Sequence, residues 1–145
     1  WTMQSCWHNL PQFDPDGAKY DQQPGAAFAA ADVTVTDALD GLAMDLAPAY
    51  GSVPGLGRYR RSVHLTDTGL TLRDETDYPG TVALTLMSVE KPVAFGALAA
   101  AAVTGADKIV TEAVPIADPR LRQAWPDTLY RTRIYFTQQL SLVIG

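Results

Sequence analysis

Ten prolines and eleven glycines interrupt this sequence at short intervals and leave few stretches long enough for a helix. Between these residues, apolar and polar side chains alternate with the period of two that is typical of half-buried strands. Residues 81–89 are instead apolar on both faces, which predicts a strand buried between two layers. The alternating runs cover residues 33–36, 42–46, 58–65 and 70–72.

Residues 131–137 and 140–144 are predicted to form a final strand pair, and residues 67–69 a hairpin turn. Residues 97–103 are expected either as a helical turn or as a loop that packs small side chains. Strands in this number, with turns between them, favour an all-β fold, an antiparallel two-layer β-sandwich of about 8–12 strands. The length of 145 residues predicts a single β-sandwich domain over residues 1–145.

The net charge and the cysteine content of the chain disfavour or exclude several classes of binding site. The net charge of −5 disfavours binding to nucleic acid or to an anionic membrane, since phosphate contacts need clustered Lys and Arg. A single cysteine, Cys6, excludes an internal disulfide framework and a multi-cysteine zinc cage. We recognise no signal peptide or transmembrane segment. Trp1 stands where an initiator methionine would, so the chain is expected to be part of a larger protein and its localisation stays open.

Few residues outside the expected strands point to chemistry. Cys6 and His8 would point the same way on a strand, but same-face neighbours seldom give the geometry of a Cys–His nucleophile pair. A small buried cysteine is therefore the favoured interpretation. Residues 14–17 (DPDG) are interpreted as a turn rather than a calcium loop, because the third acidic ligand and the late bidentate Glu are missing.

Two charged groups remain. The three carboxylates in residues 74–77 are best interpreted as a solvated strand end, with paired acid–base catalysis as the alternative. Arg58, Arg60 and Arg61 stand out in an acidic chain and could form a basic patch for an anionic sugar. The alternative is that Arg58 and Arg60 line a solvent face while Arg61 packs its stem under an acid.

A series of short motifs runs in order along nearly the whole chain. The motifs are SCWHNLP at residues 5–11, then Phe13, Gly17, Gln22 or Gln23, Gly25 and Phe28-Ala29, then DLAPAY at 45–50, YRRSV at 59–63 and LRD at 72–74, and finally residues 121–125 and 129–131. Their order and spacing resemble the C-terminal β-sandwich domain of the heparinase II/III-like family of polysaccharide lyases.

This resemblance implies that the chain is the C-terminal part of an enzyme. Its substrates would be acidic glycans that contain uronic acid, of the glycosaminoglycan or alginate type, cleaved by β-elimination. In that family an N-terminal α/α-toroid domain of the same polypeptide supplies most catalytic groups, and the sandwich forms one edge of the cleft. The resemblance implies His8 as an auxiliary catalytic residue at the cleft edge, and Trp7, Asn9 and Arg60 as substrate-binding residues. The isolated chain is expected to be inactive.

Some members of that family also hold a zinc ion in the sandwich through two histidines and an aspartate. His8, Asp32 and His64 are the matching residues here, and two neutral imidazoles with one carboxylate suit zinc with water as the fourth ligand. The chain departs from the pattern because Cys6 and Leu10, rather than a second histidine, flank the His-Asn pair. His8 is therefore either a zinc ligand or a cleft residue.

The alternative function is a non-catalytic carbohydrate-binding or structural module. Trp7, Tyr20 and Trp125 would then stack on sugar rings. If the chain is a lyase domain, the face with Trp7, His8 and Asn9 is expected to lie beside a hollow or to be covered by self-association with a second copy.

Overall fold

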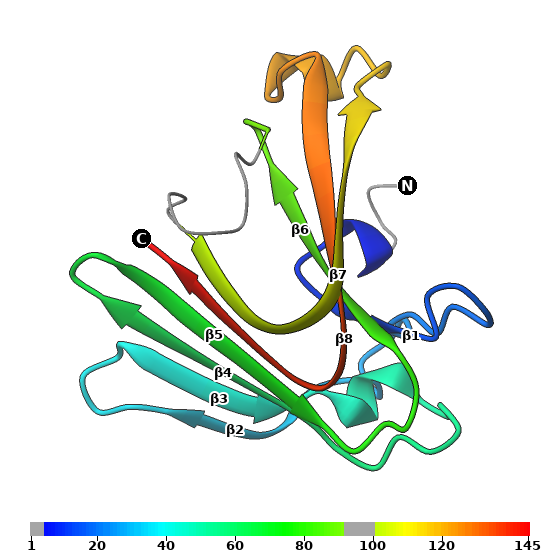
Figure 1. Ribbon diagram of the computed structural model, residues 1–145, viewed down its shortest axis with the longest axis vertical. Coiled ribbons are helices and arrows are strands. Elements are labelled where there is room, and N and C mark those ends of the chain that lie inside the picture. Colours follow the sequence, from blue (N-terminus) through cyan, green and yellow to red (C-terminus); the bar gives the residue numbers. More distant parts are fainter. Residues whose placement is uncertain (1–4, 92–100) are drawn as a thin grey trace.

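The protein has an all-β, sandwich-like fold made of antiparallel strands, as the sequence predicts (Figure 1). The computed structural model describes residues 5–91 and 101–145. None of the helices in these two ranges has the length and apolar character needed to span a bilayer. The elements are the 3-10 helices η1 (Ser5–Trp7), η2 (Ala47–Tyr50) and η3 (Leu121–Gln123), and the strands β1 (Pro11–Phe13), β2 (Ala31–Val35), β3 (Gly41–Asp45), β4 (Tyr59–Thr66), β5 (Gly69–Thr76), β6 (Val82–Ser88), β7 (Ala101–Pro115) and β8 (Thr128–Ile144).

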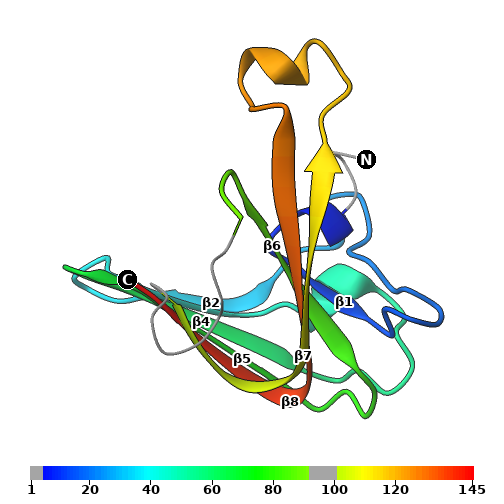
Figure 2. The same ribbon diagram turned by 45° about the horizontal axis from the view of Figure 1, so that its top comes forward.

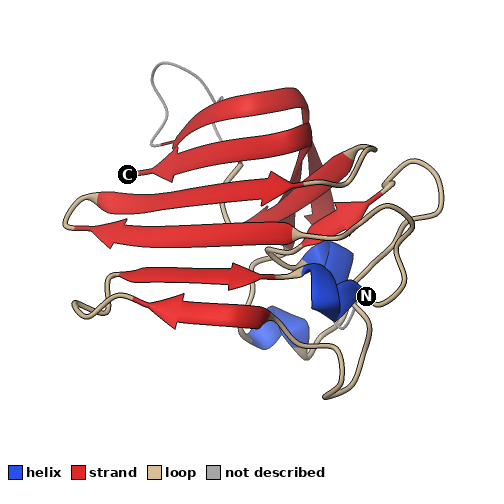
Figure 3. Ribbon diagram, turned by 90° about the horizontal axis from the view of Figure 1, so that it is seen from below, coloured by secondary structure: helices blue, strands red, loops and turns tan. Residues whose placement is uncertain are grey.

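One sheet folds over on itself to make both layers. Its strand order is β1-β6-β8-β5-β4-β3-β2, and β7 pairs with β8 along nearly their whole length. Within the first half of β8, residues 130–136 pair with β6 and belong to the smaller layer with β1. The second half, residues 139–144, pairs with β5 and belongs to the larger layer, whose strands lie side by side in Figure 3. The long β7–β8 ribbon therefore joins the two layers.

The ribbon bends where both of its strands leave ordinary strand geometry. Gln138 in β8 has a φ of 65° and Gly105 in β7 a φ of 87°, and the β7–β8 register shifts on either side of Ala106. Such positive φ values and bulges turn a strand without ending its pairing. The expected pair of final strands is wrong for this reason: residues 131–137 and 140–144 belong to the single bent strand β8.

Beyond the last β6–β8 pair, Ser88 with Tyr130, the ribbon continues without the smaller layer beside it. We call this projecting part, residues 113–130, the arm. It carries η3 at its tip and stands clear of the rest of the protein at the top of Figures 1 and 2. The arm supplies one wall of the site described below.

The core fills the space between the two layers and is rich in aromatic rings. Phe13 is fully buried, and the rings of Tyr50, Tyr59 and Tyr78 each meet it edge to face at 4.9–5.5 Å between centroids. Edge-to-face contacts of this kind stabilise a core by about 0.5–1.5 kcal/mol each beyond the area that they bury. Phe136 and aliphatic residues of both layers complete the core: Leu72, Val82, Leu84, Ile134, Leu140 and Leu142.

Most strands lie where the alternation predicts them. β2, β3, β4 and β6 match the predicted runs within a few residues, and the turn between β4 and β5 is the predicted hairpin. Residues 14–17 form the predicted turn, in which an Asp14 carboxylate oxygen accepts the N–H of Ala18. Strand β7 was not predicted, and its first three residues overlap the segment expected as a helical turn or loop. Residues 97–100 of that segment lie outside the described residues.

The bend predicts different costs for two glycine substitutions. An added Cβ at Gly105 would lie 2.5 Å from the carbonyl oxygen of Gln139, whereas at Gly25, which also has a positive φ, it would meet nothing within 4 Å. Gly105→Ala should therefore lower the free energy of unfolding by about 2–5 kcal/mol, since backbone strain and overlap both act. Gly25→Ala should cost about 1–2 kcal/mol from strain alone. Urea unfolding measures both, and equal costs would contradict the close approach of the two strands at the bend.

Candidate functional site

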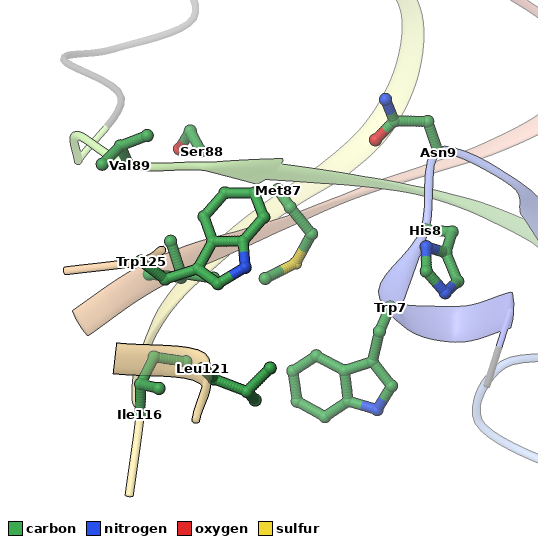
Figure 4. A pocket seen from close by; sticks show the side chains of 10 residues that line it. Trp7, His8, Asn9, Met87, Ser88, Val89, Ile116, Leu121 and Trp125 are labelled. Atoms are coloured by element: carbon green, nitrogen blue, oxygen red, sulfur yellow. The ribbon is translucent and has the colours of Figure 1, made fainter. Parts of the chain in front are cut away.

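A cavity of about 450 Å³ opens between η1, the end of β6 and the arm. Its walls are mainly apolar, which is usual for a ligand site whose few polar groups fix the orientation of the ligand. Figure 4 shows Trp7 and Trp125 on two sides of the cavity, with the side chain of Met87 reaching between them. The lining residues are Trp7, His8 and Asn9, then Met87, Ser88 and Val89 of β6 and its end, and Ile116, Leu121, Trp125 and Leu129 of the arm.

The indole ring of Trp7 is stacked on an arginine from the smaller layer. The guanidinium carbon of Arg131 lies 3.8 Å from the centroid of the Trp7 ring. Nε and Nη2 of Arg131 both contact Oε1 of Glu112, which lies opposite Arg131 in the β7–β8 register. A cation over an indole face is attracted by about 0.5–2 kcal/mol, depending on its exposure to water. The Glu112–Arg131 pair therefore fixes the plane of the Trp7 ring at the cavity wall.

A second arginine, from the larger layer, reaches the turn that follows Trp7. Nη1 of Arg61 donates a hydrogen bond of 2.6 Å to the backbone carbonyl of Asn9. The turn itself is closed by hydrogen bonds from the His8 N–H to the Ser5 carbonyl and from the Leu10 N–H to the His8 carbonyl, at 2.9 and 2.7 Å. Two of the predicted polar site residues, His8 and Asn9, thus lie in one short, hydrogen-bonded turn at the cavity rim (Figure 4).

Arg61 is buried and paired with a carboxylate. Its Nε and Nη2 donate to the two carboxylate oxygens of Asp74 at 2.7 and 2.6 Å, and the hydroxyl of Tyr59 donates to Asp74 at 2.5 Å. Burial opposes the charge of Arg61, but the hydrogen bonds and charge of Asp74 outweigh it, so the pKa of Arg61 is raised. Burial, then the charge of Asp74, raises the pKa of Tyr59 well above its usual value. Arg61 therefore stays charged and Tyr59 keeps its phenolic proton at neutral pH.

The three arginines singled out in the sequence do not form one basic patch. Arg58 and Arg60 are exposed, whereas Arg61 is only 6% exposed, so the alternative in which Arg61 packs under an acid is confirmed. Arg60 lies opposite Asp45 and Glu75 on the outer face of β4 and is not among the residues that line the cavity. The structure therefore places Arg60 away from Trp7, His8 and Asn9.

The carboxylates of residues 74–77 have three separate environments. Asp74 is fully buried, so its interpretation as part of a solvated strand end is wrong. The arginine across the strand pair supplies the charge and hydrogen bonds that offset the cost of burying a carboxylate. Glu75 forms an exposed ion pair of 2.6 Å with Arg73. Asp77 accepts the backbone N–H groups of residues 57 and 58, which lower the pKa of its carboxyl group.

The residues matched to a zinc set are spread over the sheet. His8 precedes β1, Asp32 lies in β2 at the other end of the strand order, and His64 lies in β4 with Nδ1 4.0 Å from Asp40. Among the residues that the structure describes, no three His, Cys, Asp or Glu side chains lie close enough to share one ion, and this includes His8, Asp32 and His64. Zinc binding stays a prediction, and no step proposed below depends on a metal.

Cys6 lies in η1 and is half-buried. Burial, followed by the charge of Asp21, raises the pKa of its thiol. A raised pKa reduces the fraction of thiolate, which is the reactive form of cysteine. The structure therefore agrees with the interpretation of Cys6 as a packing residue.

Comparison with known proteins identifies no relative: no protein-family model matches the chain, and no curated protein sequence matches it. The resemblance to the heparinase II/III-like family stays a prediction from the motifs.

Sequence reasoning found one wall of the cavity and missed most of the others. Trp7, His8 and Asn9 were predicted as site residues, and Trp125 was predicted to stack on a sugar ring only under the alternative function of a carbohydrate-binding module. Met87, Ile116 and Leu121 gave no functional signal, because an apolar residue in or beside a strand is expected in the core. Assigning these residues to one cavity requires knowing that the β7–β8 ribbon projects as an arm beside the end of β6. Strand β7 was not predicted, so the arm could not be predicted either.

The fixed orientation of the Trp7 ring is predicted to depend on its stacking with Arg131. Arg131→Gln removes the cation from the indole face and should lower the near-ultraviolet circular dichroism of Trp7, since the ring loses its fixed plane. Trp7→Phe identifies the contribution of that ring to the spectrum. Arg133→Gln is the matched control, because Arg133 lies two residues along the same strand and stacks on Tyr135 instead. Equal spectra for Arg131→Gln and the unaltered protein would contradict the stacking role.

Proposed function

We propose that this chain is the C-terminal β-sandwich domain of a polysaccharide lyase and that the cavity beside Trp7 forms one edge of its substrate cleft. The observation that carries the proposal is the lining of the cavity. Two indole rings, from η1 and from the arm, line one hollow with an imidazole and an amide at its rim. Flat aromatic rings stack on the apolar faces of sugars, and the polar groups can hydrogen-bond to hydroxyl and carboxylate oxygens.

The substrate class is an acidic glycan that contains uronic acid. This part of the proposal rests on the motifs that resemble the heparinase II/III-like family, and the all-β, sandwich-like fold agrees with it. The chain's net charge of −5 would repel a polyanion at long range, so binding depends on contacts within the cavity and on the rest of the protein. Affinity for the isolated chain is therefore expected to be weak.

β-Elimination removes the proton at C5 of the uronic acid and breaks the C4–O bond. The electron pair of the C5–H bond forms the C4=C5 double bond, and the departing glycosidic oxygen takes up a proton. Neutralising the uronate carboxylate makes the C5 proton more acidic. His8 can exchange a proton at the cleft edge, and Asn9 can hold an oxygen of the substrate.

Among the ten lining residues in the part of the chain that the structure describes, His8 is the single titratable one. An elimination needs a proton acceptor for C5, a proton donor for the leaving oxygen and a group that neutralises the uronate carboxylate, and one imidazole does not supply all of these, so this wall is expected to act with a second one. In the proposed enzyme, an α/α-toroid domain of the same polypeptide supplies the second wall.

The single titratable group also favours a second candidate, a carbohydrate-binding module without catalysis. Both candidates predict sugar binding at the same wall, and they differ in whether the natural polypeptide makes a product. The product of the complete reading frame should release unsaturated uronate ends from an acidic glycan, seen as near-ultraviolet absorbance, while this chain alone should release none. Glycan binding by the complete protein without any such absorbance would favour the binding module.

Removing one indole ring is predicted to weaken glycan binding. Trp125 is 48% exposed and lies on the arm, so Trp125→Ala removes contact area without opening the core. Calorimetry with a glucuronate-containing oligosaccharide should show a dissociation constant about tenfold or more higher, as is usual when a central tryptophan is truncated.

Leu39→Ala is the matched control, because Leu39 is 78% exposed and lies in the β2–β3 turn rather than at the cavity. The control should bind as the unaltered chain does. Equal dissociation constants for the unaltered chain, Trp125→Ala and Leu39→Ala would contradict glycan binding in this cavity. A second titration with the carboxyl-reduced oligosaccharide shows whether the uronate charge contributes to the affinity.

A further inference from the structure

The turn that carries His8 and Asn9 is tied to a buried ion pair in the larger layer. Nη1 of Arg61 donates to the backbone carbonyl of Asn9 at 2.6 Å, although the two residues are 52 positions apart in the sequence. Arg61 is 6% exposed and Asp74 is fully buried. The hydrogen bond therefore runs from a buried, charged donor to the backbone of the exposed site turn, where it is stronger than a bond between neutral groups.

The pairing of β4 with β5 fixes the position of the Arg61 guanidinium. Arg61 and Asp74 lie opposite one another in the register, so their side chains share the inner face of the sheet. Both oxygens of Asp74 accept from Arg61, and one also accepts from the hydroxyl of Tyr59. A planar guanidinium that is held through two nitrogens has its third nitrogen aimed in one direction. That direction is the Asn9 carbonyl.

A neighbouring hydrogen bond fixes the chain just after the turn. The hydroxyl of Tyr50, in η2, donates to the carbonyl of Pro11 at 2.6 Å. Tyr50 is buried, and its ring packs edge to face on Phe13. Two carbonyls in residues 9–11 are thus held by side chains of the core and larger layer, while Trp7 is held by Arg131 of the smaller layer.

We propose that Arg61 and Asp74 are positioning residues, which set the place of the His8–Asn9 turn at the rim of the cavity. The role in glycan binding rests on the function proposed above, whereas the placement of the turn can be measured without any glycan. A buried ion pair adds little stability compared with well-packed apolar residues, so we attribute the role of this pair to the third bond that Arg61 makes, to the site turn.

Arg61→Lys tests this role with little change in charge or volume. A lysine can pair with Asp74 but lacks the planar fork that bonds the carboxylate and the Asn9 carbonyl together. Backbone amide signals of residues 8–10 in NMR spectra should shift, and the dissociation constant for the oligosaccharide should rise about tenfold, as expected for the loss of one charge-assisted hydrogen bond. Tyr59→Phe removes one bond to Asp74 and should shift the same signals by a smaller amount.

Leu72→Ala is the control for a loss of stability alone. Leu72 is a buried core residue on β5, two positions from Asp74, and lies outside this hydrogen-bond network. Urea unfolding should first establish that the compared variants are folded. Leu72→Ala should leave the signals of residues 8–10 and the glycan affinity unchanged.

The outcomes separate the two proposals. Unshifted signals of residues 8–10 in Arg61→Lys, or shifts as large in Leu72→Ala, would overturn the positioning role. If Arg61→Lys does not fold, Tyr59→Phe decides by the same comparison. If the unaltered chain binds no glycan but the signals shift as expected, the positioning role stands and the proposed function fails. Shifted signals with an unchanged dissociation constant would limit the role to the shape of the turn and overturn its part in binding.

Discussion

The β7–β8 ribbon bends where the two layers meet, and the core, the arm and the cavity are all positioned by this bend. At Gly105 and Gln138 both strands turn with positive φ, and they are paired on either side of this bulge, so one sheet supplies both layers of the sandwich. The aromatic core is packed between those layers, and the ribbon then runs past the end of β6 as the arm. Without this bend the arm would not stand opposite η1, and the cavity between them would have one wall fewer.

The site turn is held from both layers by arginines that use different interactions. Arg131 of β8 stacks on the ring of Trp7, and Arg61 of β4 bonds to the carbonyl of Asn9. Each arginine is itself held by a carboxylate across a strand pair, Glu112 for Arg131 and Asp74 for Arg61. Side chains from both layers therefore place Trp7 and Asn9, and the geometry of the cavity rim depends on the angle between the layers. A rigid scaffold under a short turn is a common way to hold binding groups in place.

The all-β fold could be predicted from the sequence because the signal is local. Alternation with a period of two, and turns rich in Gly, Pro and Asp, placed β2 to β5 and the hairpin after Thr66, and a run that is apolar on both faces placed β6. The bend could not be predicted, since Gln138 is an ordinary residue and its positive φ is imposed by tertiary packing. Residues 138 and 139, which were expected to separate two final strands, lie instead at the bend within the single strand β8. Its partner strand, β7, was not predicted.

The candidate site was predicted in part for the same reason. The turn at residues 7–9 is contiguous in sequence, so its motif could be recognised there. The arm residues on the facing wall are more than 100 positions away and have the apolar character of ordinary core residues. Of the two interpretations of the arginines, the one in which Arg61 packs under an acid is confirmed, but the partners of Arg61, Asp74 and the carbonyl of Asn9, follow only from the register and the fold.

The central claim is that an acidic glycan binds in the cavity between η1 and the arm. The most direct measurement follows the indole N–H signals of Trp7 and Trp125 by NMR while a glucuronate-containing oligosaccharide is added, with each signal assigned by a Trp→Phe variant. If the glycan binds there, both indole signals should shift together and saturate at the same oligosaccharide concentration, because the two rings line one cavity. Both indole signals remaining unchanged at concentrations that saturate binding elsewhere, or no binding at all, would contradict this claim.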